Sequence, residues 1–143
     1  MPAMISRYQK KISGPILDRI DLHLDVPAVK VEKLTTDRDE LKGENSAVVQ
    51  KRVQESRNVQ SKRFAQTNIF ANAEMNMRDI EQFCPLNNQS LTLLRQAVSQ
   101  MGLSARSYYR IIRIARTIAD LACSKEIVIE HIAEALQYRP KRG

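Results

Sequence analysis

Apolar residues recur with a helical period over most of the chain after residue 45. The pattern is strongest from Ala105 to about Cys123, where Ser104 is well placed to cap the first turn. At about 100° per residue, apolar side chains fall on one face of this segment and arginines on the opposite face. The segment is therefore predicted to be an amphipathic helix that packs through Tyr108, Ile111, Ile112, Ala115, Ile118, Ala119 and Ala122.

Helices are also predicted over four other segments, at about residues 45–66, 77–83, 88–101 and 128–138. Asn45 or Ser46 suits the N-cap of the first of these, and Gly102 suits the C-cap of the third. The fold class predicted for residues 45–143 is mainly α, a bundle of four or five helices.

The amino-terminal part has a different pattern. From Ile20 to Val26 apolar and polar residues alternate strictly, which predicts a half-buried strand that Pro27 ends. No clear second strand follows, so we expect its sheet to lie in sequence outside this chain. In the chain by itself, residues 1–26 are expected to be disordered, docked non-natively on the helices, or paired with another copy. Residues 27–44 are predicted to be a linker.

The chain carries a net charge of +7, with a pI near 9.7. This excess suggests an anionic partner, such as nucleic acid or nucleotide phosphate, but a solvated basic surface explains it equally well. The glycines are not spaced as in a phosphate-binding loop, and no apolar run ends in Asp-Glu as a magnesium-binding strand does. The chain by itself is therefore not expected to be catalytic.

The cysteines and histidines are not spaced as in a metal site or a catalytic site. Cys84 and Cys123 lack the spacing of a metal site and are expected to be two buried thiols in a reducing cytoplasm. His23 and His131 are isolated, and a lone histidine is usually a surface or structural residue. No apolar run reaches the roughly 18–20 residues that span a bilayer, and the first residues lack a signal-peptide core. We expect a cytoplasmic protein without membrane contact.

Three stretches resemble, in the family's order, segments of the magnesium-chelatase-like AAA+ ATPases of the ComM/YifB type. They are YQKKISGPILDRIDLH at residues 8–23, GLSARSYYRIIRIARTIADL at residues 102–121 and HIAEALQYR at residues 131–139. The resemblance implies that residues 1–26 end the α/β core of such an ATPase, that residues 27–44 link, and that residues 45–143 form its helical lid.

What such proteins do gives a set of expectations for a longer parent protein. The resemblance implies a hexameric ring of identical subunits that hydrolyses ATP. The cofactors ATP and Mg²⁺ would be held by a core upstream of this chain, and none is expected in this part alone. DNA is the implied partner of the parent, because ComM is associated with branch migration of DNA during natural transformation.

The same resemblance assigns roles to individual arginines. Arg19 matches an arginine finger, which reaches the γ-phosphate of a neighbouring subunit's nucleotide. Arg106 matches the sensor-2 arginine at the start of a lid helix, where backbone N–H groups also attract an anion. Arg110 and Arg113 form a secondary basic face beside Arg106, which follows from the helical period and not from the resemblance.

Alternatives remain open on the sequence. Arg19 could ion-pair with Asp18 or Asp21, and Arg106 could be one more surface arginine. A solvent or interface position is favoured for Arg110, Arg113 and Arg116. The chain could also be a free-standing basic module that binds nucleic acid, or the lid of a metal-chelatase motor.

Overall fold

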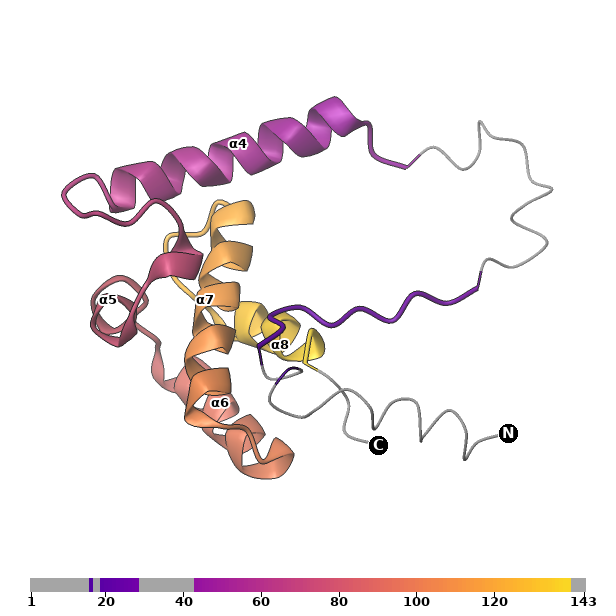
Figure 1. Ribbon diagram of the computed structural model, residues 1–143, viewed down its shortest axis with the longest axis vertical. Helices are drawn as coiled ribbons and strands as arrows, with labels where there is room; N and C mark the ends of the chain where they lie inside the picture. The colour runs from indigo at the N-terminus through magenta and orange to yellow at the C-terminus, as the bar shows by residue number, and fades with distance from the viewer. Residues whose placement is uncertain (1–15, 17–18, 29–42, 140–143) are drawn as a thin grey trace.

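The path of the chain is helical in a computed structural model that describes residues 16, 19–28 and 43–139 (Figure 1). Five α-helices and one 3₁₀ helix, η1, follow one another in the described residues, and these residues contain no β-sheet. The mainly α fold predicted from the sequence is confirmed. The elements are α4 (Ser46–Arg63), η1 (Asn72–Glu74), α5 (Met77–Phe83), α6 (Asn88–Met101), α7 (Ala105–Leu121) and α8 (Ile129–Gln137).

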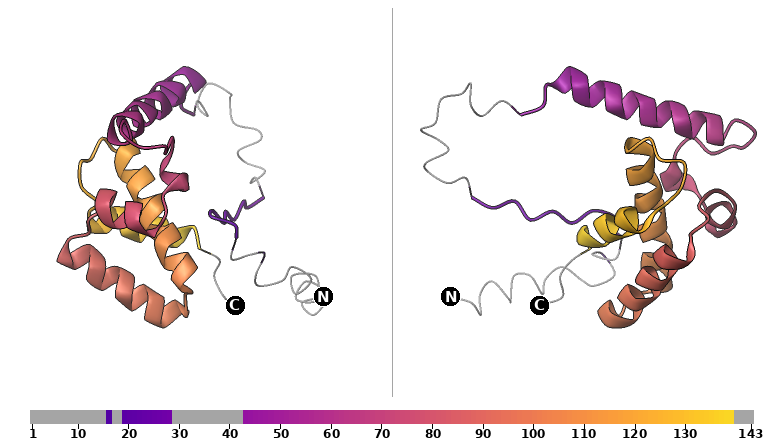
Figure 2. Two further views of the ribbon diagram at one scale, coloured as in Figure 1. Left: turned by 60° about the vertical axis from the view of Figure 1, so that its left-hand side comes forward. Right: turned by 180° about the vertical axis from the view of Figure 1, so that it is seen from behind.

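Helix α7 is the centre of the bundle: α8 packs against it, α4 lies across its upper end, and α6 packs against α8 (Figures 1 and 2). Ile111, Ala115 and Ala119 of α7 are completely buried, as the helical period predicted. Ile132 of α8 and Leu94 of α6 are buried just as fully. Full burial of each such Ile or Leu side chain contributes about 1.5–3 kcal/mol, so this contact region accounts for much of the stability of the fold.

Side-chain caps set where the helices begin. The Asn45 and Ser104 side chains accept hydrogen bonds from the first turns of α4 and α7, as predicted. Asn76 and Asn87 do the same for α5 and α6. Gly102 ends α6 with φ 57°, in the left-handed region expected of a C-cap glycine.

Helix α4 ends earlier than predicted. The polar pattern continues to Gln66, but the helix stops at Arg63 because Phe64 turns into the core and is only 2% exposed. There the Phe64 ring meets the Phe83 ring edge to face, with centroids 5.3 Å apart. Helix α4 has no continuous apolar face, because Val48, Val53 and Val59 are scattered among polar residues and exposed. Its first half projects beyond the bundle (Figures 1 and 2).

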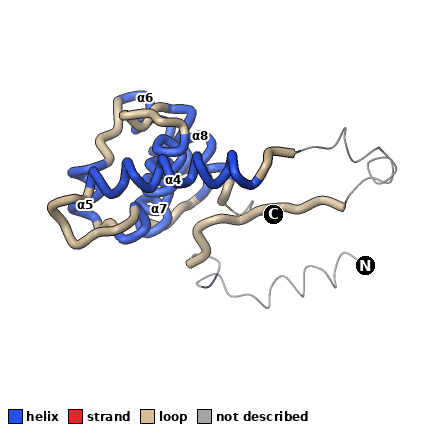
Figure 3. The backbone as a smooth tube through the Cα atoms, turned by 90° about the horizontal axis from the view of Figure 1, so that it is seen from above, coloured by secondary structure: helices blue, strands red, loops and turns tan. Residues whose placement is uncertain are grey.

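The predicted strand from Ile20 to Val26 is not formed. Residues 19–28 are drawn out but irregular, and Figure 3 shows this segment as a loop beside the helices. Its backbone joins the bundle where the His23 N–H donates to the Tyr138 carbonyl at 2.9 Å. Leu22 and Leu24 are 51% and 70% exposed, because the described residues include no second strand that could cover them. The described part of this segment, residues 16 and 19–28, thus contacts the helices, whereas residues 1–15 and 17–18, to which the expectation also applied, lie outside the described residues.

A buried polar network joins α4, η1 and α7. The completely buried carboxylate of Asp120 accepts hydrogen bonds from Arg63, Arg116 and the Asn72 side chain. Arg116 also donates to the Ser124 and Lys125 carbonyls, which lie just beyond the end of α7. Arg116 is 2% exposed, so the expectation of a solvent or interface position was wrong for this residue. Its partners lie at the end of its own helix, and they make burial of the charge possible.

The two cysteines differ in environment. Cys84 is buried as predicted, and burial raises the pKa of its thiol from 9.0 to about 11. Cys123 is exposed, which contradicts the prediction of two buried thiols. The helical period does not reach this far, because α7 ends at Leu121 and Cys123 turns out of the helix with φ 55°.

Candidate functional site

The first turn of α7 presents Arg106 to solvent. Ser104 caps this turn, where its Oγ accepts from the Ser107 N–H at 3.2 Å, and Arg106 is the second residue of the helix. The Arg106 side chain is exposed. An exposed guanidinium beside the positive end of a helix can contact an anion, and the sensor-2 role of Arg106 stays a prediction.

Arg19 is likewise exposed, in a short turn where its N–H donates to the Ile16 carbonyl at 2.9 Å. The sequence left open an ion pair between Arg19 and Asp18 or Asp21. Asp21 instead pairs with Arg110, with 3.0 Å between Nε and Oδ1. Asp18 lies outside the described residues.

Arg110 and Arg113, the predicted secondary basic face, are engaged in contacts within the protein. Arg110 is 7% exposed and pairs with Asp21. Arg113 donates to the Ala73 carbonyl at 2.6 Å and to the Met75 carbonyl at 3.3 Å. Burial lowers the pKa of Arg113, and the nearby positive charge of Arg110 lowers it further, whereas Asp21 raises it. The expectation of a solvent or interface position was wrong for Arg110, because the arm, which comprises residues 19–28, supplies the Asp21 carboxylate that pairs with it.

Sequence reasoning missed Arg139. This side chain follows α8 and is 4% exposed. It donates to the Ile20 carbonyl at 3.4 Å and to the Ser107 hydroxyl. Arg139 is the last residue of the third matching stretch, but it lies beyond the periodic part of the last helix, so no pattern singled it out.

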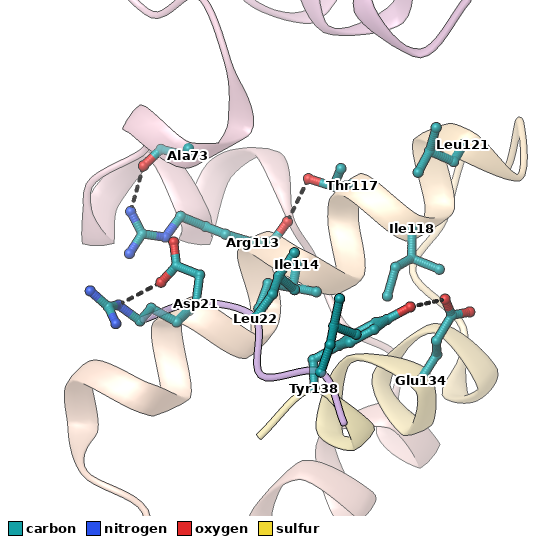
Figure 4. A pocket seen from close by; sticks show the side chains of 12 residues that line it. Asp21, Leu22, Ala73, Arg113, Ile114, Thr117, Ile118, Leu121, Glu134 and Tyr138 are labelled. Atoms are coloured by element: carbon teal, nitrogen blue, oxygen red, sulfur yellow. Dashed lines mark hydrogen bonds and ion pairs between the residues drawn. The ribbon is translucent and has the colours of Figure 1, made fainter. Parts of the chain in front are cut away.

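A cavity of about 440 Å³ lies between the arm, α7 and α8 (Figure 4). Leu22 and Leu24 border it from the arm, and Ile114 and Ile118 border it from α7. At its rim the Tyr138 hydroxyl donates to Glu134 at 3.2 Å. The lining is mixed, because the charged side chains of Asp21, Arg110, Arg113 and Glu134 also border the cavity.

The described part of the chain contains neither a cluster of metal ligands nor a membrane-spanning helix. No group of three or more His, Cys, Asp or Glu side chains in residues 16, 19–28 and 43–139 is arranged to hold a metal ion. No helix in these ranges has the length and apolar character needed to cross a membrane. His131, 9% exposed, has a structural role, because its Nδ1 accepts from the Val128 N–H at 3.2 Å.

Comparison with known families places the helical bundle in a class of protein, the lid region of an AAA+ protein. Family models identify the member of this class. The model for the carboxy-terminal part of magnesium chelatase subunit ChlI matches residues 43–139. The model for magnesium chelatase subunit ChlI matches residues 1–34. The chain belongs to the magnesium chelatase ChlI C-terminal family.

Individual relatives agree with this assignment. Competence protein ComM of Haemophilus influenzae is 40% identical over 138 residues, which is 96% of this chain and 26% of the relative. The uncharacterized protein YifB is 38% identical in Escherichia coli and 36% in Salmonella typhimurium, with the same coverage. The chain thus spans about a quarter of the length of these relatives, and the resemblance inferred from the three sequence stretches is confirmed.

Proposed function

We propose that this chain is the lid region of a ring-forming AAA+ ATPase, in which Arg19 and Arg106 contact nucleotide phosphates. One observation carries the proposal. Arg19 and Arg106 are exposed, whereas Arg110, Arg113 and Arg116 are occupied by protein partners. Of the five arginines singled out from the sequence, the two assigned to phosphate by family resemblance are therefore the exposed ones, although arginines outside this set, such as Arg95, are exposed as well.

The chemistry requires cations that reach the phosphate oxygens. Negative charge on the transferring phosphoryl group must be stabilised, and a guanidinium does this with two parallel hydrogen bonds and a permanent charge. Arg19 acts on the nucleotide of a neighbouring subunit, and Arg106 contacts phosphate from the lid. ATP and Mg²⁺ themselves are held by a core that precedes this chain in a longer protein.

DNA processing is the activity that we propose for the longer protein, working as a hexamer. The name of the Haemophilus relative, a competence protein, supports DNA uptake or branch migration as the context. A second candidate is the motor of a metal chelatase, which the description of the matching family model favours. The two are separated by measuring whether branched DNA or a porphyrin-handling partner accelerates ATP turnover.

The test of the proposed function is ATP turnover by the longer protein. We expect Arg19→Ala to lower kcat by about a thousandfold, as for other arginine fingers. We expect Arg106→Ala to lower kcat by about a hundredfold, the usual effect of losing one donor to developing charge. The control is Arg95→Ala, because Arg95 is an exposed arginine on α6.

Two outcomes would contradict the proposal. Turnover that is unchanged in both Arg19→Ala and Arg106→Ala would remove the two arginines from the mechanism. Hydrolysis of ATP by the 143-residue chain alone would show a nucleotide site of its own.

A further inference from the structure

Arg139 touches both segments that carry the proposed phosphate contacts. Its guanidinium donates to the Ile20 carbonyl at 3.4 Å and to the Ser107 hydroxyl. Ile20 directly follows Arg19, and Ser107 directly follows Arg106. One buried side chain therefore bridges the backbone next to the first arginine and the helical turn that holds the second.

A second arginine strengthens the same connection. Arg110 lies one turn beyond Arg106 on α7, and its side chain is 8% exposed. It pairs with Asp21 at 3.0 Å, and Figure 4 shows this carboxylate turned from the arm toward α7. The pair lies two residues from Arg19, so it fixes the arm on the other side of Ile20.

The end of α8 adds a backbone contact. The His23 N–H donates to the Tyr138 carbonyl at 2.9 Å, and Tyr138 is the neighbour of Arg139. Ile20, Asp21 and His23 are thus each held by a different group of the bundle. A buried guanidinium requires its partners, because an uncompensated buried charge is unfavourable, so the contacts of Arg110 and Arg139 are stiffer than surface ion pairs.

We propose that Arg139 and Arg110 are positioning residues that hold Arg19 in a fixed place relative to Arg106. This inference rests on the proposed function, in which both of the positioned arginines act on ATP. Its consequence is mechanical: a displacement of α7 moves the arm with it. A movement of the lid over one nucleotide therefore also moves Arg19, which acts on the nucleotide of another subunit.

The central experiment is a double-mutant cycle for ATP turnover in the longer protein, with Arg139→Ala and Arg19→Ala alone and together. We expect Arg139→Ala to lower kcat by roughly ten- to a hundredfold, because a displacement of about 1 Å has effects of this size. The KM for ATP should change by less than about threefold. In the Arg19→Ala background, Arg139→Ala should lower kcat no further, because the group that it positions is already absent.

Asp21→Asn is the second variant, for the case that Arg139→Ala fails to fold. The Asp21 side chain is 53% exposed, so its replacement leaves the core intact. We expect a smaller loss of kcat than for Arg139→Ala, again absent in the Arg19→Ala background. Arg139→Lys keeps the charge and should recover part of the rate. Arg95→Ala is the matched control in both backgrounds.

Hydrogen exchange separates the failure of this inference from that of the proposed function. The exchange rate of the His23 N–H should rise in Arg139→Ala or Asp21→Asn, whether or not ATP is involved. Unchanged exchange, or equal losses of kcat in both backgrounds, would overturn the positioning role while Arg19→Ala still abolishes turnover. If Arg19→Ala alone leaves turnover unchanged, the proposed function fails and this inference falls with it.

Discussion

At the scale of single residues, Asp120 is the carboxylate on which the buried polar network depends. Its carboxylate is fully buried and accepts from Arg63, Arg116 and Asn72. We expect Asp120→Ala to lower the free energy of unfolding by about 3–5 kcal/mol, because it leaves the buried charge of Arg116 without its carboxylate partner. Urea denaturation followed by circular dichroism measures this change.

The control for the Asp120 experiment is Asp25→Ala, at an exposed carboxylate on the arm. Its free energy of unfolding should stay within about 0.5 kcal/mol of the parent value, as for ordinary surface substitutions. A loss below about 1 kcal/mol in Asp120→Ala would show that the network contributes little to stability.

Cys84 gives the fold a pH dependence in the alkaline range. Burial raises the pKa of its thiol from 9.0 in a solvated environment to about 11 in the folded chain. The folded state therefore favours the protonated thiol, so the contribution of Cys84 is fully present below pH 9 and is lost as the pH rises toward 11. We expect the stability difference between the parent and Cys84→Ala to shrink over this interval, as measured by urea denaturation at pH 8 and pH 10.5. If this stability difference did not change with pH, the raised pKa of the Cys84 thiol would be contradicted.

The exposed thiol of Cys123 offers a check that needs no titration. Iodoacetamide at pH 8 should modify Cys123 in the folded chain and reach Cys84 only after unfolding, because the thiolate is the reactive form.

At the scale of elements, the junction between α6 and α7 depends on Gly102. Its φ of 57° and ψ of 43° define a left-handed backbone conformation that is unfavourable for residues with a Cβ atom. We expect Gly102→Ala to destabilise the fold by about 1–2 kcal/mol, as measured by thermal unfolding.

The matched control is Gly43→Ala, because a Cβ at Gly43 meets no atom within 4 Å and φ there is not positive. This variant should be neutral or slightly stabilising. If Gly102→Ala and Gly43→Ala changed the stability equally, the left-handed conformation of Gly102 would not be the cause of the destabilisation.

Helix starts were predictable from sequence, whereas helix ends were less so. Asn45 and Ser104 mark the first residues of their helices because their side chains accept hydrogen bonds from N–H groups of the first turn. The end of α4 depends on the contact between the Phe64 and Phe83 rings, which are well separated in the sequence. A local pattern does not contain this information.

At the scale of the whole molecule, the bundle is independent of the arm in its apolar core. All the buried apolar residues of the described chain lie between Phe64 and Ala135. We expect a variant of residues 43–139 to unfold cooperatively, because it keeps the apolar core, but with a Tm below that of the parent, because Arg110 and Arg139 lose their partners in the arm. Differential scanning calorimetry measures both quantities. A chain without a cooperative transition would show that the arm is part of the core.

The sequence by itself determined the helices, their caps and the apolar face of α7, because these depend on neighbours within a turn or two. It also pointed to the family and to Arg19 and Arg106, whose roles remain proposals. Only the tertiary structure decided which arginines stay at the surface. Arg110 and Arg139 are buried because a carboxylate, a carbonyl and a hydroxyl from other parts of the chain contact them. Arg116 is buried because Asp120 and two carbonyls at the end of its own helix are its partners. The strand pattern of Ile20–Val26 failed because a strand exists only where another one pairs with it.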